Sequence, residues 1–199
     1  MTTRSSELSS ETSESAPSVR HLESLDDIPR EIAERRIQAE FSESVDPEQS
    51  KLLHEAPDVI ENQDDFEKSA MAVGIEDTDG LRGFASRPED PAHVLRLEDV
   101  SSRIETEAHE DLHRLTHPEL LKEANENPAL KEFYEGVTQF LTEQAMDGLH
   151  DYQPGEIYPE QTEAARHLAV EVGDQAVRDL FFKHEMSDEV RQALDRISA

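Results

Sequence analysis

The sequence predicts a mainly α-helical protein with a small β-sheet, preceded by a disordered, acidic N-terminal arm. Apolar residues recur at helical spacing in several segments after residue 100. Glycine and proline divide residues 74–97 into short runs typical of strands, and residues 1–20 are mostly serine, threonine and glutamate with little to bury. A chain of 199 residues fits one domain plus an appendage. We therefore divide it into an arm of residues 1–45 and a domain of residues 46–199.

The arm is expected to be partly helical. Residues 29–41 fit an amphipathic helix with Ile32, Ile37 and Phe41 roughly on one side. Such a helix can dock on the domain or on a protein partner, and the sequence leaves both possibilities open. Residues 1–20 can act as a tether, an export tag or simply a solvated tail.

The first part of the domain is predicted to contain short helices followed by short strands. Asp46-Pro47 and Ala56-Pro57 are expected to start helices within residues 46–70. Further along, residues 84–86 and 93–97 are expected to form small strands. An edge strand of this sheet can pair with an extended peptide through main-chain hydrogen bonds.

The segment after Ser102 is predicted to be a helix that ends before Pro118. Ser102 and Glu105 match a capping box at its start, and Pro118 ends it because residue 117 is pushed out of the helical region. Its apolar residues form a stripe at helical spacing, made of Ile104, Ala108, Leu112 and Leu115.

This helix carries the pattern His-Glu-x-x-His at residues 109–113. His109 and His113 lie one turn apart beside the apolar stripe, so both imidazoles can reach one zinc ion at Zn–N distances of about 2.0–2.1 Å. Glu110 lies beside the metal, where a base acting on water must be. His117 continues the row, but it lies about 12 Å from His109 along a helix and cannot share the ion while the helix continues. The alternative interpretation is a solvated, charged helix face with two unrelated histidines.

A third ligand is expected from the next helix, because a catalytic zinc typically has three protein ligands and one water. Pro128 fits the first turn of this helix after Asn127, and Glu135 lies to one side of its apolar stripe of Leu130, Phe133, Val137 and Leu141. A short connection through residues 116–127 can return the helix antiparallel to the first and bring Glu135 to the histidines. The alternative is an ordinary exposed glutamate.

The ordered pair of motifs, His109-Glu110-x-x-His113 and Glu135-Gly136-Val137-Thr138, resembles the gluzincin type of zincin metallopeptidase. The likeness covers roughly residues 70–199. It implies a minimal zincin-like domain in which His109, His113 and Glu135 bind zinc and Glu110 acts as general base and acid. It also implies hydrolysis of a peptide or protein substrate.

The same resemblance assigns roles to three other residues. Tyr158 or His167 would donate a hydrogen bond to the developing oxyanion, as a downstream tyrosine or histidine does in gluzincins. Gln139 stands where the family usually has a carboxylate that can orient a ligand imidazole. An amide oxygen can still accept the imidazole N–H, but it lacks the charge that raises the basicity of the ligand.

The C-terminal part is predicted to be helical. One helix runs through Val172 and stops at Gly173, a second runs from Asp174 to about Lys183, and the last is capped by Ser187.

The composition excludes two classes of partner. The chain has 47 acidic and 19 basic residues, with a formal net charge of −28. We expect no binding to nucleic acid or to an anionic membrane surface, because like charges repel there. The acidic residues are spread along the chain, which resembles proteins from salt-loving cells, where concentrated salt screens self-repulsion. Disorder is the competing explanation.

The chain has no cysteine, so it can form neither disulfides nor thiolate metal sites. No apolar run is long enough to cross a bilayer, and the first twenty residues lack the apolar core of a signal peptide. We therefore expect a cytoplasmic protein.

Two alternatives to a zinc peptidase stay open from the sequence. One is a non-catalytic, acidic interaction protein that keeps a zincin-like scaffold and docks on an assembly through its N-terminal arm. The other is a structural zinc site, closed by a fourth protein ligand such as His117.

Overall fold

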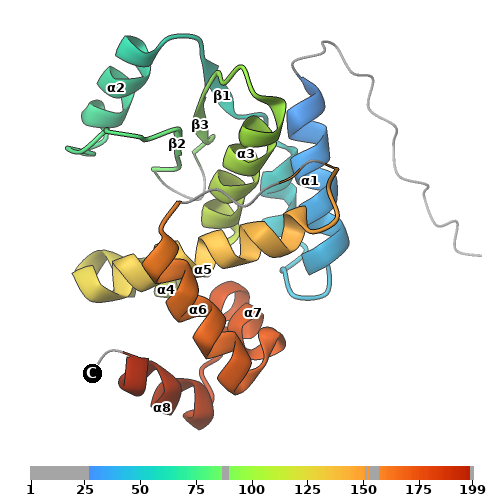
Figure 1. Ribbon diagram of the computed structural model, residues 1–199, viewed down its shortest axis with the longest axis vertical. Helices are drawn as coiled ribbons and strands as arrows, with labels where there is room; N and C mark the ends of the chain where they lie inside the picture. The colour runs from blue at the N-terminus through green and yellow to red at the C-terminus, as the bar shows by residue number, and fades with distance from the viewer. Residues whose placement is uncertain (1–26, 87–89, 151, 153–156, 198–199) are drawn as a thin grey trace, which may run out of the picture.

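The computed structural model describes residues 27–86, 90–150, 152 and 157–197 (Figure 1). Helices make up most of these residues, and three short strands form one small sheet. The predicted fold class, mainly α with a small β-sheet, is confirmed. The disorder predicted for residues 1–20 lies outside the described residues.

The elements follow one another with short connections. The first half contains α1 (Ile28–Phe41), the 3₁₀ helix η2 (Gln49–His54), β1 (Asp58–Ile60), α2 (Gln63–Ala72), β2 (Gly83–Phe84) and β3 (His93–Leu95). The second half is helical, with α3 (Val100–Leu115), α4 (Pro118–Glu126), α5 (Pro128–Met146), α6 (Pro159–Val172), α7 (Asp174–Lys183) and α8 (Asp188–Ile197).

The sheet has the strand order β1-β3-β2, with β1 parallel and β2 antiparallel to β3. The prediction that Ala56-Pro57 starts a helix is wrong, because the residues after Pro57 form β1. The N–H of Asp58 donates to the carbonyl of Ala92 (2.7 Å), and the N–H of Arg96 donates to the carbonyl of Ile60 (2.9 Å). This pairing with a distant segment determines the local conformation.

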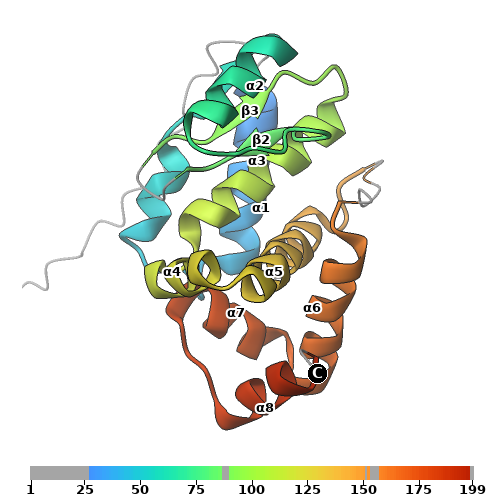
Figure 2. The ribbon, with the colours of Figure 1, turned by 90° about the vertical axis from the view of Figure 1, so that its left-hand side faces the viewer.

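Helix α3 is the central element of the fold. In Figures 1 and 2, the sheet and α2 lie on one side of α3 and α1 lies on the other. Helix α5 crosses α3, and α6, α7 and α8 lie beyond α5. Direct contacts join α3 to α1, α5, β2 and β3.

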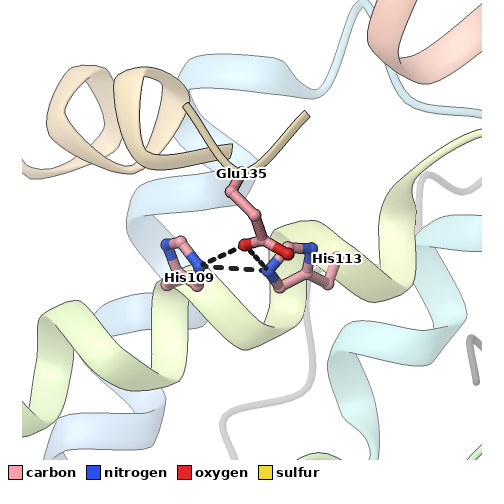
Figure 3. A group of neighbouring side chains, drawn as sticks. All are labelled: His109, His113 and Glu135. Carbon is pink, nitrogen blue, oxygen red and sulfur yellow. Dashed lines mark hydrogen bonds and ion pairs between the residues drawn. The ribbon is translucent and has the colours of Figure 1, made fainter. Parts of the chain in front are cut away.

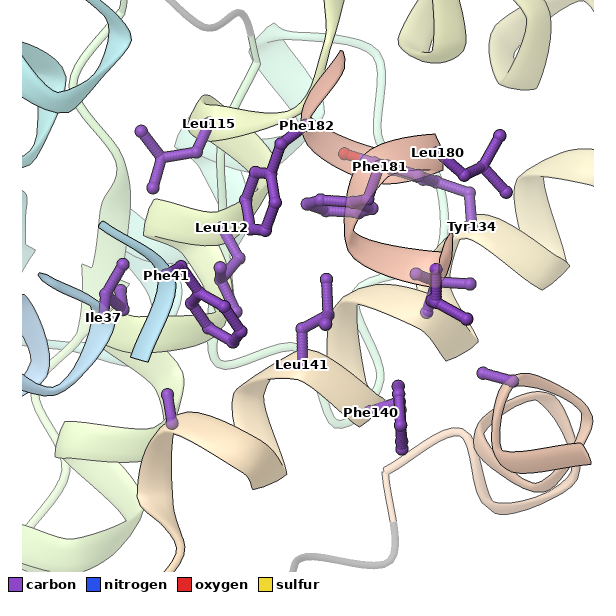
Figure 4. Close-up of a cluster of buried hydrophobic side chains, with 14 of the residues drawn as sticks. Ile37, Phe41, Leu112, Leu115, Tyr134, Phe140, Leu141, Leu180, Phe181 and Phe182 are labelled. Carbon is purple, nitrogen blue, oxygen red and sulfur yellow. The ribbon is translucent and has the colours of Figure 1, made fainter. Parts of the chain in front are cut away.

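The main hydrophobic core is shared by α1, α3, α5 and α7 (Figure 4). Its large buried side chains include Ile37, Phe41, Leu112, Leu115, Leu141, Phe181 and Phe182. Burying one such side chain contributes roughly 1.5–3 kcal/mol, so the apolar face of α1 holds that helix firmly on the domain. The helix expected within the arm thus docks on the domain, and its buried side chains belong to the main core.

Among the described residues, no helix combines the length and the apolar character that are needed to cross a membrane.

Candidate metal centre

Helix α3 begins earlier than the sequence suggested. Its N-cap is Asp99, whose carboxylate accepts a hydrogen bond from the N–H of Ser102 (2.6 Å). The predicted capping box of Ser102 and Glu105 is therefore wrong, and Glu105 is buried within the fold. The helix ends at Leu115, ahead of Pro118, as expected.

The predicted apolar stripe of α3 is buried, and the two histidines lie beside it. The side chains of His109 and His113 are only 10% and 14% exposed. The alternative of a solvated helix face is therefore wrong, because both imidazoles are largely removed from water.

Three potential ligand atoms converge between α3 and α5 (Figure 3). The Nε2 atoms of His109 and His113 are 3.0 Å apart. The nearer carboxylate oxygen of Glu135 lies 3.2 Å from Nε2 of His113 and 3.7 Å from Nε2 of His109. The alternative of an ordinary exposed glutamate at position 135 is excluded by this contact.

The separations fit one tetrahedral ion. Four ligands at about 2.0–2.1 Å from a zinc ion lie about 3.3–3.4 Å from one another. The three observed separations of 3.0, 3.2 and 3.7 Å lie on both sides of this value. Because no lysine or arginine among the described residues forms an ion pair with Glu135, a cation bound here would not have to displace a protein cation.

A directed chain of hydrogen bonds fixes the orientation of His113. The hydroxyl of Thr116 donates to the carbonyl of Leu112 (3.1 Å), so the hydroxyl of Tyr134 donates to Thr116 (3.0 Å). The oxygen of Tyr134 then accepts from the Nδ1–H of His113 (2.7 Å). This arrangement places the lone pair of His113 on Nε2, the atom that points at Glu135.

A second chain fixes His109. Its Nδ1 lies 3.0 Å from the side-chain oxygen of Gln139, which can only accept, so Nδ1 carries the proton. The amide nitrogen of Gln139 donates to the carboxylate of Glu105 (3.0 Å), and the hydroxyl of Tyr152 donates to the same carboxylate oxygen (3.1 Å). As with His113, the free lone pair is on Nε2.

Opposing effects act on the pKa of Glu135. Burial favours the neutral acid, but His113 and His109, when their rings also carry a proton on Nε2, outweigh it by charge and hydrogen bonding and hold the pKa well below its usual range. The group is therefore a carboxylate at neutral pH, the form that binds a metal ion.

Helix α5 positions Glu135 through signals that the sequence contained. Asn127 caps the helix by accepting from the N–H of Ala129 (3.1 Å), and Pro128 occupies its first position, as predicted. The short connection expected through residues 116–127 contains a helix that was not predicted, because residues 118–126 form α4. Helix α4 forms because Pro118 starts it and because Leu120 and Ala124 are buried in the core.

His117 takes a different role from the histidines of α3. Its side chain accepts a hydrogen bond from the N–H of Glu119 (3.2 Å) at the start of α4, and its ring stacks on His184 at 5.4 Å. In the described parts of the chain, the candidate metal group contains three residues and no fourth protein ligand. A structural site closed by His117 is therefore not formed.

Glu110 is buried next to the ligand group, and a glycine makes room for it. One oxygen of its carboxylate, Oε2, is buried without a hydrogen-bond partner. A Cβ atom at Gly83 of β2 would lie 2.7 Å from Cγ of Glu110 and 2.8 Å from a methyl carbon of Thr106. Burial raises the pKa of Glu110 to about 8, opposed by His109 and reinforced by the charge of Glu135.

The opposite face of α3 also carries buried charges, but these are paired. Asp111 forms ion pairs with Arg30 of α1 and with Arg114. Glu107 accepts a hydrogen bond from Nε of Arg103 (2.9 Å). Burial raises the pKa of Glu107 to about 7 and that of Asp111 to about 6, and the arginines oppose the shift in both cases.

The candidate metal centre lies in a cleft of about 520 Å³. On one side the cleft is lined by the segment after α2 and by β2, and on the other side by α4 and α5. The apolar lining residues include Val73, Ile75, Leu81, Phe84, Leu121 and Ala124. The volume is typical of a site that binds a small molecule or a short peptide segment.

Tyr158 faces this cleft, whereas His167 does not. The ring of Tyr158 stacks at 6.2 Å from that of His109, and its backbone adopts a left-handed conformation (φ 51°) at the start of α6. The side chain of His167 is 71% exposed and contacts Glu163 of its own helix. Of the two oxyanion donors suggested by the resemblance, only Tyr158 is near the candidate site.

Gly136 brings α6 close to α5 and so determines where Tyr158 lies. A Cβ atom at Gly136 would be only 2.2 Å from the carbonyl oxygen of Gln161. No side chain larger than hydrogen fits at this helix crossing.

Two residues of the site were not identified from the sequence. Tyr134 directly precedes Glu135, and its hydroxyl holds His113. Glu105 lies four residues before His109 and therefore on the same helix face, which is a usable signal. No family model, curated protein or solved structure with which the chain was compared matches it.

Proposed function

We propose that the protein is a zinc-dependent peptidase, a hydrolase that cleaves peptide bonds. One observation carries this proposal. His109, His113 and Glu135 direct three ligand atoms at one point, and the Nδ1 atom of each imidazole is already held by another side chain. Ligand imidazoles in zinc sites usually donate their second N–H in this way.

The donor set favours zinc over a harder ion. Two imidazole nitrogens and one carboxylate oxygen match the ligands of catalytic zinc sites, whereas magnesium and calcium prefer oxygen ligands. Bound zinc would supply Lewis acidity that polarises a carbonyl and lowers the pKa of water to about 7.

Glu110 would move the proton. It follows His109 directly, lies against the cleft and keeps one carboxylate oxygen without a protein partner. In the proposed reaction Glu110 acts as a carboxylate, the form that the positive charge of bound zinc would favour. It accepts a proton from the attacking water as the water oxygen bonds to the carbonyl carbon. It then delivers that proton to the leaving nitrogen as the C–N bond breaks.

Tyr158 would stabilise the charge that develops on the carbonyl oxygen. Burial raises the pKa of its phenol above the usual range, and the charges of Glu135 and Glu110 act in the same direction. Tyr158 therefore keeps its proton and remains a hydrogen-bond donor beside His109.

The cleft wall supports a peptide as the substrate. Strand β2 is an edge strand, since its only strand neighbour in the described sheet is β3. Gly83 and Phe84 of β2, with Ala85 and Ser86 after it, line the cleft. An extended peptide can add to such an edge by main-chain hydrogen bonds.

Metal analysis of the purified protein tests the proposal directly. We expect about one zinc ion per chain, lost in His109→Ala. Glu110→Gln should keep the zinc but lower the rate of peptide cleavage about 10²- to 10⁴-fold. Protein that takes up no zinc would favour the alternative, a non-catalytic acidic interaction protein.

A further inference from the structure

We infer that Glu105 is a positioning residue, which supplies negative charge to the ligand His109 through the side-chain amide of Gln139. The inference rests on the zinc site proposed above. It assigns to Glu105 the charge that an amide at position 139 cannot provide by itself.

The geometry leaves one consistent direction for the hydrogen bonds. Nδ1–H of His109 donates to Oε1 of Gln139 (3.0 Å), and Nε2–H of Gln139 donates to Oε1 of Glu105 (3.0 Å). Gln139 is fully buried and Glu105 is 4% exposed, so no bulk water competes for these bonds. Turning the amide round would place its NH₂ group against a ring N–H and its oxygen against a carboxylate.

Two helical rows bring these groups together. Glu105 and His109 lie one turn apart on α3, and Glu135 and Gln139 lie one turn apart on α5. The two helices cross so that His109 contacts both residues of the α5 row. The same register that delivers the ligand Glu135 therefore delivers the amide.

The two ligand histidines are supported differently. The chain behind His113 passes through Tyr134 and Thr116 and ends at the neutral carbonyl of Leu112. The chain behind His109 ends at a carboxylate. A carboxylate that accepts from an amide N–H polarises the amide and makes its oxygen a stronger acceptor. The imidazole of His109 thereby becomes a more basic ligand.

Zinc affinity, measured by competition with a chelator, tests this role without a substrate. Glu105→Gln should weaken zinc binding about tenfold, because the loss of a residue that supports a ligand typically costs 10–100-fold. Glu107→Gln is the matched control. Glu107 is equally buried on the same helix, but it contacts Arg103 on the opposite face, so its variant should bind zinc within about threefold of the wild type.

An exchanged pair separates charge from structure. In Glu105→Gln with Gln139→Glu, the carboxylate accepts directly from His109 and the amide donates to that carboxylate, so both hydrogen bonds between His109, residue 139 and residue 105 are preserved. We expect zinc affinity equal to or tighter than that of the wild type. A merely structural role for Glu105 would not be rescued by this exchange.

The zinc affinities of the wild type, Glu105→Gln and the exchanged pair together test both the role of Glu105 and the zinc site. Weaker binding in Glu105→Gln, restored in the exchanged pair, supports the inference. Unchanged affinity in Glu105→Gln, or an exchanged pair that is folded by circular dichroism but still weak, overturns it while leaving the zinc site intact. A wild-type protein that binds no zinc overturns the proposed function itself. If Glu105→Gln does not fold, the affinity of the exchanged pair alone decides.

Discussion

The two faces of α3 are both buried and both charged, yet they satisfy their charges in different ways. On the face toward α1, Glu107 and Asp111 each have an arginine partner from the protein. On the cleft side of α3, neither Glu110 nor Glu135, which faces it from α5, forms an ion pair with any lysine or arginine among the described residues.

This difference separates scaffold from site. Isolated charges are costly to bury, and buried charges are therefore paired or coordinate metal ions. On the α1 face, arginines pair with the buried carboxylates, so this face stabilises the packing of the helices. The cleft face leaves a carboxylate and two imidazoles around one point, so its missing positive charge is one that a bound cation can provide.

The largest expected effect on stability comes from removing a buried arginine on the α1 side of α3. The side chain of Arg114 is 1% exposed, and it donates to the carbonyl of Leu52 (2.9 Å) and to the carboxylate of Glu55 (2.5 Å). Arg114→Met would remove these bonds and weaken the compensation of Asp111. We expect the free energy of unfolding to fall by about 3–5 kcal/mol, measured by urea denaturation.

An exposed ion pair provides the control for this variant. Arg35 pairs with Glu31 on the surface of α1, and its side chain is 72% exposed. Arg35→Met should change the free energy of unfolding by less than about 1 kcal/mol. Equal effects of the two variants on the free energy of unfolding would contradict a structural role for the buried ion pairs. A folded Arg114→Met protein with strongly reduced zinc affinity would contradict the separate roles of the two faces.

The next effect concerns the cleft face and is expected to depend on metal. Zinc at a hundredfold excess over its dissociation constant should raise the free energy of unfolding by about 2.7 kcal/mol. Glu135→Gln should lower the stability of the metal-free protein at neutral pH, because it removes the interaction with the imidazoles that depresses the pKa of Glu135. It should also reduce the zinc-dependent gain to below about 1 kcal/mol, because a ligand charge is lost. Thermal unfolding with and without zinc measures both quantities.

Glu132→Gln is the matched control for Glu135→Gln. Glu132 lines the same cleft from the same helix but is not in the ligand group. It should keep the full zinc-dependent gain. Equal gains in Glu135→Gln and the wild type would show that Glu135 is not a ligand.

Local signals in the sequence account for most of the helices. Pro128, Gly173 and Ser187 mark helix ends where the structure has them, because caps and breakers act on the residues next to them. Strand β1 was missed because its hydrogen bonds go to β3, more than thirty residues away. Nothing within residues 56–60 specifies a parallel partner.

The same distinction applies to the candidate site. The row of His109 and His113 follows from helical spacing alone, and Glu135 followed from the order of two motifs. Glu105 was misassigned because Ser-x-x-Glu is a good local capping pattern, whereas Asp99 provides the actual cap. The role that we infer for Glu105 depends on Gln139, which α5 places beside it. A contact across two helices has no signature in either segment alone.

The smallest effect tests whether the cleft face needs its packing as well as its charges. Gly83→Ala places a methyl group 2.7–2.8 Å from Glu110 and Thr106, closer than carbon atoms can approach, so the carboxylate of Glu110 must move. A displacement of about 1 Å can lower activity 10²-fold, and partial relaxation of β2 should limit the loss to about tenfold in kcat. Zinc content should be unchanged, because the atoms nearest to the added Cβ belong to Glu110 and Thr106 and to none of the three candidate ligands. Gly80→Ala, at a position before β2 where φ is +73° and no atom lies within 4 Å of the added Cβ, strains the backbone without touching Glu110 and should leave kcat nearly unchanged. A Gly83→Ala protein with full kcat would show that Glu110 does not need its observed position. If the variant lost zinc as well as activity, β2 would be shown to support the histidine ligands of α3. The position of Glu110 and the binding of zinc would then not be independent.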